Sequence, residues 1–286
     1  MKNVFISISV IVSTISFAME TPHTPLKRGI LIAVEGIDGS GKSTLGHHLY
    51  DALKHTYVNI SLTKEPGDTR VGQKIRKIVQ TQTTSLDPKT EYLLFAADRA
   101  EHFSKIILPL LQENYIVISD RLADSSLAYQ GYGRNLDKDM IQLINQYAMS
   151  NRKPDLTIFV KVPVQTALER IKKRNVALST FEKESFLEKV DAGFNTIYAN
   201  YCTSERFEKF SKYNQELYIS QLEQNKTNII YPTTTPLNLT KLDPAEFKTI
   251  PAQHVKVITV NGVESEQEVA NKTIAVVSEW IARNNQ

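Results

Sequence analysis

Apolar runs of strand length alternate with longer stretches of helical periodicity from Gly29 to the end of the chain. The run "ILIAVE" is apolar up to its last residue, which is typical of a parallel strand buried on both faces. The five predicted strands span residues 30–35, 57–63, 115–120, 155–162 and 255–260. Strands separated by helices imply right-handed crossovers and helices on both faces of the sheet. The pattern therefore predicts a three-layer α/β/α protein with a five-stranded parallel sheet.

Helical patterns fill the connections between these runs. They begin near Lys42 and at Pro163, and they cover residues 71–79, 88–112, 137–149 and 264–282. Proline at 163 suits the first turn of a helix, where its missing N–H is not needed. Pro109 lies inside the longest pattern and predicts a break there, because proline removes one helical hydrogen bond and clashes with the preceding turn.

Two segments depart from the alternation. Residues 205–253 contain "NIIYPTTTPLNLTKLDP", which is rich in Pro, Thr and Asn, so we expect a loop-rich surface insertion without a catalytic role. Residues 1–18 carry a lysine at position 2, an apolar core and small residues at 16 and 18, the form of a secretory signal. The alternative is an upstream artefact with the true start at Met19. We therefore set residues 1–28 apart from a single domain over residues 29–286.

Composition narrows the function classes. The chain has 286 residues, of which 41% are hydrophobic and 23% charged, an ordinary globular profile. A formal net charge of +3 is too slight for a nucleic-acid partner but suits a small substrate that carries phosphate. Cys202 is the only cysteine, so the chain can form neither an internal disulfide framework nor a cysteine-based zinc site.

A phosphate-binding motif follows the first strand. The segment "GIDGSGKS" matches the pattern G-x-x-x-x-G-K-[ST] between a strand and a helix, the context that a P-loop requires. Glycines let backbone N–H groups turn toward a phosphate, Lys42 can bridge the β- and γ-phosphates of ATP, and the Ser43 hydroxyl can bind Mg²⁺. The residues predicted to bind the nucleotide are Gly36, Ile37, Asp38, Gly39, Ser40, Gly41, Lys42, Ser43 and Thr44.

A second motif, "YIVISDR", ends the third predicted strand. It brings the Asp120 carboxylate to the same edge of the sheet as the P-loop, where it can hold the water shell of a metal ion. Arg121 beside it can bind a phosphate, although an Asp-Arg pair after a strand is often only a salt-bridged loop. Taken with the P-loop, the pair predicts a Mg²⁺ site at Ser43 and Asp120.

The chain resembles the thymidylate kinase family. The segments "EGIDGSGKST", "TKEPGDT", "LLFAADRAEH", "DRLADSSLAYQG", "PDLTIFVKVP" and "ALERIKKR" occur in the order and at the spacing of that family. The resemblance implies an α/β/α P-loop fold with a helical lid at about residues 172–184. It also implies an ATP-dependent kinase that uses Mg²⁺, acts on dTMP as a small-molecule substrate, and forms a homodimer.

The resemblance also assigns residues to the acceptor nucleotide. Phe95 corresponds to the aromatic residue that stacks on thymine, and Arg99, four residues further along the same helix, to the arginine that donates to a thymine carbonyl. Arg121 corresponds to the arginine that binds the acceptor phosphate. The remaining matches are Glu65 in the acceptor-side loop, Ser126 and Tyr129 beside the base and deoxyribose, and Asp38 between the two nucleotides.

The chain departs from the family at several positions. The P-loop carries no arginine at Gly39, so the lid must supply the positive charge, and Arg174 is the first candidate with Arg170 behind it. Thr180 stands where the lid usually has an arginine. Leu122 replaces an aromatic residue after the Asp-Arg pair. Asp68 replaces a glycine in a turn, and we expect the turn to survive because aspartate tolerates positive φ.

We therefore expect the reaction ATP + dTMP → ADP + dTDP, a step toward dTTP, with Lys42, Asp38, Arg121 and Arg174 as catalytic residues. Two alternatives stay open: another nucleotide or nucleoside kinase, and a weakened nucleotide-binding protein with an interaction role. A cytoplasmic location, with no nucleic acid or membrane as partner, fits the need for ATP, whereas residues 1–18 argue for export.

Overall fold

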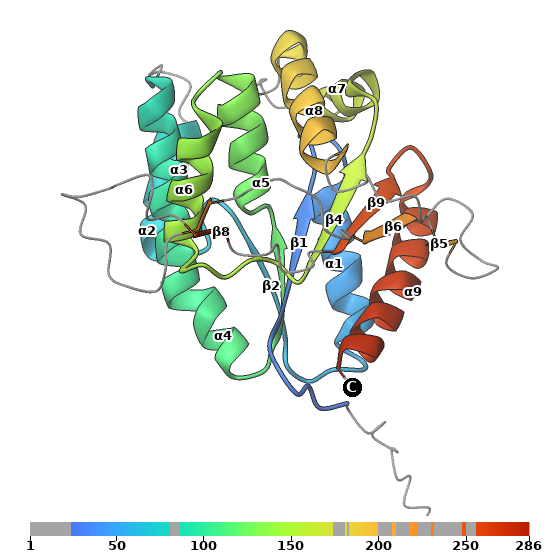
Figure 1. The fold of residues 1–286 in the computed structure, drawn as a ribbon. Helices are drawn as coiled ribbons and strands as arrows, with labels where there is room; N and C mark the ends of the chain where they lie inside the picture. Colours follow the sequence, from blue (N-terminus) through green and yellow to red (C-terminus); the bar gives the residue numbers. More distant parts are fainter. Residues whose placement is uncertain are drawn as a thin grey trace, which may run out of the picture.

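The computed structural model describes residues 24–80, 86–173, 181, 183–199 and 256–285, and the backbone of four short strands between 208 and 249. Five parallel strands form the centre of the sheet in the order β2-β3-β1-β4-β9. They are β1 (Ile30–Glu35), β2 (Ile60–Lys64), β3 (Ile116–Asp120), β4 (Leu156–Lys161) and β9 (Lys256–Asn261). The predicted five-stranded parallel sheet is confirmed, and its carboxyl ends meet at one edge (Figure 1).

Helices cover both faces of the sheet (Figure 1). On one face lie α1 (Lys42–Leu53) and α9 (Glu266–Asn284), which pack against each other. The other helices are α2 (Arg70–Gln80), α3 (Pro88–His102), α4 (Leu108–Gln112), α5 (Ala123–Ser126), α6 (Lys138–Ala148), α7 (Val164–Lys172) and α8 (Glu184–Ala199). Short side chains start the long helices: Asp87 accepts from the backbone of α3, Asp137 from that of α6, and Ser265 forms a capping box with Glu268 in α9.

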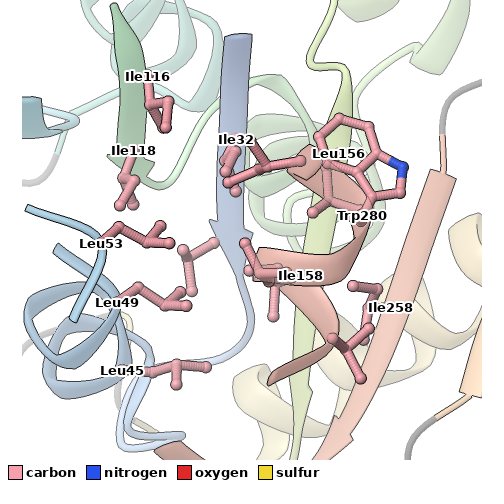
Figure 2. Close-up of a cluster of buried hydrophobic side chains, with 14 of the residues drawn as sticks. Ile32, Leu45, Leu49, Leu53, Ile116, Ile118, Leu156, Ile158, Ile258 and Trp280 are labelled. Carbon is pink, nitrogen blue, oxygen red and sulfur yellow. The ribbon is translucent and has the colours of Figure 1, made fainter. Parts of the chain in front are cut away.

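The period-2 alternation of β1 divides its side chains between two cores. Ile30, Ile32 and Val34 point toward α1 and α9, while Leu31 and Ala33 point to the opposite face. Figure 2 shows the first core, in which the leucines of α1 face the sheet across from Trp280 of α9. Because both faces are covered, all six residues of β1 are buried, and the strand that leads into the P-loop is rigidly held.

Two helical segments contain π-turns, η1 (Phe103–Ile107) and η2 (Leu127–Gly133). The break predicted at Pro109 begins before the proline, in η1. In a regular α-helix the ring of Pro109 would clash with the carbonyl of Lys105, four residues earlier, and the wider π-turn of η1 contains this residue. Helical periodicity then resumes in α4.

The insertion differs from the expected loop. Within it, β6 (Tyr218–Gln221) pairs antiparallel with β9, and β5 (Glu208–Lys209) pairs with β6, so the sheet gains two strands at that edge. A separate pair is formed by β7 (Ile230–Tyr231) and β8 (Lys248–Thr249). An added strand satisfies the backbone groups that β9 would otherwise expose at the edge.

Candidate active site

The P-loop wraps from the end of β1 into the first turn of α1. Gly39 and Gly41 have φ of 80° and 96°, in the left-handed region that glycine adopts without a Cβ penalty. Lys42 is only 6% exposed, and its Nζ donates to the carbonyl of Ile37 at 3.4 Å. Burial lowers the pKa of Lys42, and the nearby carboxylate of Asp38, 3.5 Å away, favours its charged form. A buried ammonium in this cradle is suited to an anionic ligand.

Ser43 and Asp120 lie together, as the sequence predicts. The Ser43 hydroxyl donates to Asp120 Oδ2 at 2.5 Å, joining the first turn of α1 to the end of β3. The other oxygen, Oδ1, is buried and has no hydrogen-bond partner among the described residues. Buried polar atoms normally have partners, so an unpartnered carboxylate oxygen beside a hydroxyl is a fitting ligand for Mg²⁺, which prefers oxygen.

Arg121 forms the centre of an ion-pair cluster at the same edge. Its Nη2 donates to Asp38 Oδ1 at 2.6 Å and to the Tyr129 hydroxyl at 3.2 Å, and that hydroxyl donates to Asp38 Oδ2 at 2.9 Å. Burial alone would raise the pKa of Asp38, but the Arg121 guanidinium and Lys42 hold it well below its usual range. The backbone of Arg121 has φ of 76°, and a left-handed non-glycine residue at a ligand site is a form of local strain that functional sites often carry.

Glu35 was not foreseen as a site residue. It is fully buried at the end of β1, where its Oε1 accepts from the backbone N–H of Leu122 at 2.8 Å and its Oε2 from the Ser125 hydroxyl at 2.5 Å. Ser125 Oγ in turn accepts from Arg121 Nη1 at 2.9 Å. Burial, with Asp124 nearby, raises the pKa of Glu35. Glu35 therefore fixes the loop that presents Arg121, and a carboxylate ending an apolar run was the only sequence signal for it.

Arg99 of α3 is 2% exposed and is enclosed by four acceptors from three separate segments. Nε donates to Glu65 Oε2 at 2.9 Å, and Nη1 donates to Asn145 Oδ1 at 2.6 Å. Nη2 donates to the Leu122 carbonyl at 3.1 Å and to Ser126 Oγ at 3.0 Å. These contacts use four of the five guanidinium hydrogens, leaving one on Nη1. Asn145 of α6 is a second residue that the sequence did not reveal.

Aromatic rings lie near this arginine. Phe95, half-buried on α3, meets the ring of Phe181 edge-on with centroids 6.3 Å apart. Phe181 also lies 6.3 Å from the ring of Tyr129, so Phe95 and Tyr129 approach one residue of the predicted lid from two sides. Phe95, Arg99, Ser126 and Tyr129 thus gather in one region beside Arg121, as expected of an acceptor site. Such flat rings suit a nucleobase.

The turn after β2 differs from its expectation. Positive φ falls on Gly67, at 109°, and Asp68 is not among the described residues with positive φ. The Asp68 side chain instead accepts a hydrogen bond from the hydroxyl of Thr63. The predicted reason for tolerance of aspartate at this position was therefore wrong: the side chain has a partner, and the backbone needs no left-handed conformation there.

A cavity of about 320 Å³ lies on the other side of the P-loop. Its lining includes Gly39, Ser40, Gly41 and Thr44 of the loop, His48 of α1, Arg170 of α7, and Gly262, Glu264 and Glu266 before and in α9. Arg170 Nη1 donates to the Ser40 carbonyl at 3.2 Å, and Nη2 to the Gly262 carbonyl at 2.7 Å. Arg170 therefore joins the P-loop to the β9–α9 turn, and its side chain lines the cavity next to the P-loop.

Several predicted features lie outside the described residues: the signal-like segment 1–18, Met19, Cys202, and the lid residues Arg174 and Thr180. Arg174 as a catalytic residue therefore stays a prediction. Among the helices that the structure does describe, none is both long and apolar enough to cross a bilayer.

The sheet edge thus combines a P-loop, a carboxylate with one oxygen unpartnered among the described residues, and an arginine cluster beside a second site lined by aromatic rings. This combination defines a P-loop kinase.

The family model for thymidylate kinase matches residues 34–229. A thymidylate kinase of Halothermothrix orenii is 44% identical over 143 residues, covering 50% of this chain and 69% of the relative. One from Prochlorococcus marinus is 40% identical over 181 residues, covering 60% and 82%. The crystal structure of thymidylate kinase from Ehrlichia chaffeensis has a TM-score of 0.51 at 36% identity, covering 60% and 87%. The chain belongs to the thymidylate kinase family, the kinases that phosphorylate dTMP.

Proposed function

We propose that this chain transfers the γ-phosphoryl group of ATP to the phosphate of dTMP, with the P-loop as donor site and the Arg121–Arg99 region as acceptor site. The observation that carries this assignment is the cluster of Lys42, Asp38 and Arg121, in which donor-side and acceptor-side cations share one carboxylate. Two phosphate sites that meet at a common counter-ion are suited to direct transfer between two anions.

On the donor side, the backbone of residues 36–44 would bind the β-phosphate, and Lys42 would bridge the β- and γ-phosphates. Ser43 and Asp120 would hold Mg²⁺, which supplies charge neutralisation on the phosphates when bound. The unpartnered Asp120 Oδ1 supports this assignment. Arg170 supports the donor cavity from its rim, and Arg174 is proposed as a further lid cation.

On the acceptor side, Arg121 would bind the phosphate of dTMP. The free Nη1 hydrogen of Arg99 is available for a pyrimidine carbonyl, and Phe95 supplies a ring for stacking. Glu65 would act by holding Arg99, with Ser126 beside it. Tyr129, fixed by Asp38 and Arg121, would restrict the space near the sugar.

The mechanism needs no general base, because the attacking phosphate oxygen of dTMP is already anionic. Lys42 and Arg121 neutralise charge on the donor and acceptor phosphates, and Asp38 holds both cations toward the point of transfer. Closure of a lid at about residues 172–184 would exclude water and so limit hydrolysis of ATP.

We also propose that the domain, residues 29–286, works as a homodimer in the cytoplasm, where ATP is plentiful. The helices α2, α3 and α6 are neighbours (Figure 1), and each carries exposed apolar side chains, which support a subunit interface. They are Val71 and Ile78 of α2, Leu93 of α3, and Met140 and Tyr147 of α6. Exposed apolar side chains on neighbouring helices are typical of an association surface.

A coupled assay that detects ADP tests the proposed substrate on the full chain and on a form that begins at Met19. We expect dTMP to be the best acceptor, dUMP weaker, and purine monophosphates negligible. Preference for AMP or CMP would contradict the substrate assignment.

Single-turnover transfer tests the P-loop assignment. Lys42→Ala should abolish transfer, whereas Lys54→Ala, an exposed lysine at the end of α1, should leave it unchanged. Wild type that binds both nucleotides yet transfers no faster than Lys42→Ala would overturn the kinase assignment.

A further inference from the structure

A buried polar chain lies directly behind Arg99, and the proposed chemistry does not yet use it. His102 of α3 is 1% exposed, with its Nδ1 3.1 Å from Glu65 Oε1 and its Nε2 2.6 Å from the hydroxyl of Thr63. Thr63 also contacts Asp68 Oδ2. The sequence of contacts is therefore Asp68, Thr63, His102, Glu65 and Arg99, and it runs from the acceptor-side turn to the residue that faces the base.

The hydrogens in this chain can be assigned by counting donors and acceptors. A carboxylate only accepts, a threonine hydroxyl has one hydrogen, and an imidazole ring can carry one or two. Glu65 is ionised, because Arg99 and His102 lower its pKa against the effect of burial. The nitrogen of His102 that faces Glu65 must therefore carry a hydrogen.

The other end of the chain fixes the second ring nitrogen. Asp68 is half-buried and reaches water, so its carboxylate accepts, and the single hydrogen of Thr63 points to it. Thr63 can then only accept from His102, so Nε2 also carries a hydrogen. This count of hydrogens gives both ring nitrogens a donor role, which is the arrangement of an imidazolium.

The charges around His102 agree with this assignment. Glu65 and Asp68 provide two negative charges, and Arg99 and His102 provide two positive charges. Asp98 of α3 also faces the cluster, and burial together with Glu65 raises its pKa to about 6. From α2, Arg76 donates to the Pro66 carbonyl at 2.8 Å and borders the same turn. A neutral His102 would leave a buried excess of negative charge, which is costly.

We propose that Asp68 and His102 are positioning residues for base selection: through Thr63, Asp68 keeps His102 in the imidazolium form, and the imidazolium shares Glu65 with Arg99. Because the Glu65 carboxylate is then shared between two cations, it offsets less of the positive potential that Arg99 presents to the base. A pyrimidine with a carbonyl oxygen at position 4 is favoured, and one with an amino group there is disfavoured. This inference rests on the proposed role of Arg99 in reading the base.

A glycine at position 68 would change the arrangement. With no carboxylate at that position, Thr63 could donate its hydrogen to Nε2, and His102 would become neutral with a hydrogen on Nδ1 only. Asp68→Gly is therefore the sharpest perturbation, because it removes the charge without altering any residue that contacts Arg99.

The first test measures the ring directly and needs no substrate. Nitrogen-15 NMR of the full-length protein, with His102 assigned by the signal lost in His102→Gln, should show two protonated ring nitrogens at neutral pH. In Asp68→Gly one of them should become unprotonated. A neutral ring in the wild type, or no change in Asp68→Gly, would overturn the proposal whether or not the protein is a dTMP kinase.

The second test measures selectivity as the ratio of kcat/KM for dTMP to that for dCMP. Asp68→Gly and His102→Gln should each lower the ratio about fivefold to tenfold, a coupling of ~1 kcal/mol between neighbouring groups of one hydrogen-bond network. The double variant should lower it no further, because the two residues act in one chain. KM for dTMP should rise while kcat and KM for ATP stay near wild type.

A control variant separates selection from loss of structure. Asp155→Asn removes a carboxylate that pairs with Arg28 and Arg152 at the start of β4, the sheet edge opposite the active site. It should leave the ratio unchanged. An imidazolium confirmed by NMR together with an unchanged ratio in Asp68→Gly would contradict the role in base selection while leaving the kinase assignment intact.

Discussion

A matched pair of glycine substitutions in the P-loop tests how tightly the loop is held. Gly39 and Gly41 both have positive φ, so alanine at either position meets the same kind of backbone strain, roughly 1–2 kcal/mol. Their surroundings differ. A Cβ on Gly39 would lie 2.4 Å from the carbonyl oxygen of Ala167 in α7, whereas the nearest atom to a Cβ on Gly41 is Arg170 Nη1 at 3.9 Å.

The two contacts give different expected losses of unfolding free energy. Gly41→Ala should cost only the backbone strain. Gly39→Ala must in addition displace the backbone of α7, and crowding of that kind costs roughly 1–3 kcal/mol. We therefore expect a loss of roughly 2–5 kcal/mol for Gly39→Ala and roughly 1–2 kcal/mol for Gly41→Ala.

Urea unfolding of the two variants and the wild type measures these losses, with ATP binding measured in parallel. Gly39→Ala should also raise the Kd for ATP more than Gly41→Ala, because α7 and the loop border the same cavity. Equal losses in the two variants would refute the argument that α7 limits the loop at Gly39. The same contact leaves no room for an arginine side chain at position 39 unless α7 moves.

Three further substitutions test separate features. Asp98→Asn should stabilise the protein above pH 6 relative to wild type. Burial raises the pKa of Asp98 from 3.8 to about 6 in the folded protein. The protonated carboxyl group therefore contributes fully to the free energy of unfolding below pH 3.8, the pKa in the unfolded chain, and this contribution is lost as the pH rises through 6. The difference corresponds to about 3 kcal/mol in urea unfolding at pH 8 against pH 4, and a constant difference between the variants across that range would contradict it. Arg121→Lys should raise the KM for dTMP about tenfold or more and leave the KM for ATP almost unchanged. A lysine keeps the positive charge but loses the hydrogen bonds to Gly36, Ser125 and Asp38. An equal rise in KM for both nucleotides would refute the role of Arg121 in acceptor binding. Trp280→Phe should change the free energy of unfolding by less than about 2 kcal/mol, because the lost ring volume is offset by removal of an N–H that is buried without a partner among the described residues. A larger loss in calorimetry would mean that this N–H has a hydrogen-bond partner.

The fold could be predicted from sequence because its signals are local. Each strand of the parallel sheet is a short apolar run, and each long helix has a period, a cap or a proline that marks its start. The π-turns at 103–107 and 127–133 escaped prediction because one wide turn does not change the apolar pattern enough to be seen. The pairing of β6 with β9 also escaped, because a strand of four residues gives almost no periodic signal.

The site was predictable only where a motif lies in one contiguous segment. Lys42, Ser43 and Asp120 follow directly from strand ends and a P-loop pattern. The enclosure of Arg99 was not predictable, because Glu65, Asn145 and Ser126 come from segments far apart in sequence, and nothing local links them. The expectation for Asp68 concerned its backbone conformation alone, whereas in the structure its side chain makes the contact, with Thr63.

Three neighbouring strands end in or near a carboxylate, and the donors that face each one decide what it does. Glu35, the last residue of β1, accepts from two backbone N–H groups and a hydroxyl, so it holds the loop of Arg121 through hydrogen bonds. Glu65, after β2, accepts from Arg99 Nε and lies 3.1 Å from His102 Nδ1, so it fixes the position of Arg99. Asp120, at the end of β3, accepts from one hydroxyl and keeps one buried oxygen without a partner among the described residues, which supports our proposal that this carboxylate holds Mg²⁺. The same residue chemistry at the same sheet edge therefore has three different surroundings, and the difference lies in how many hydrogens the fold supplies to each carboxylate.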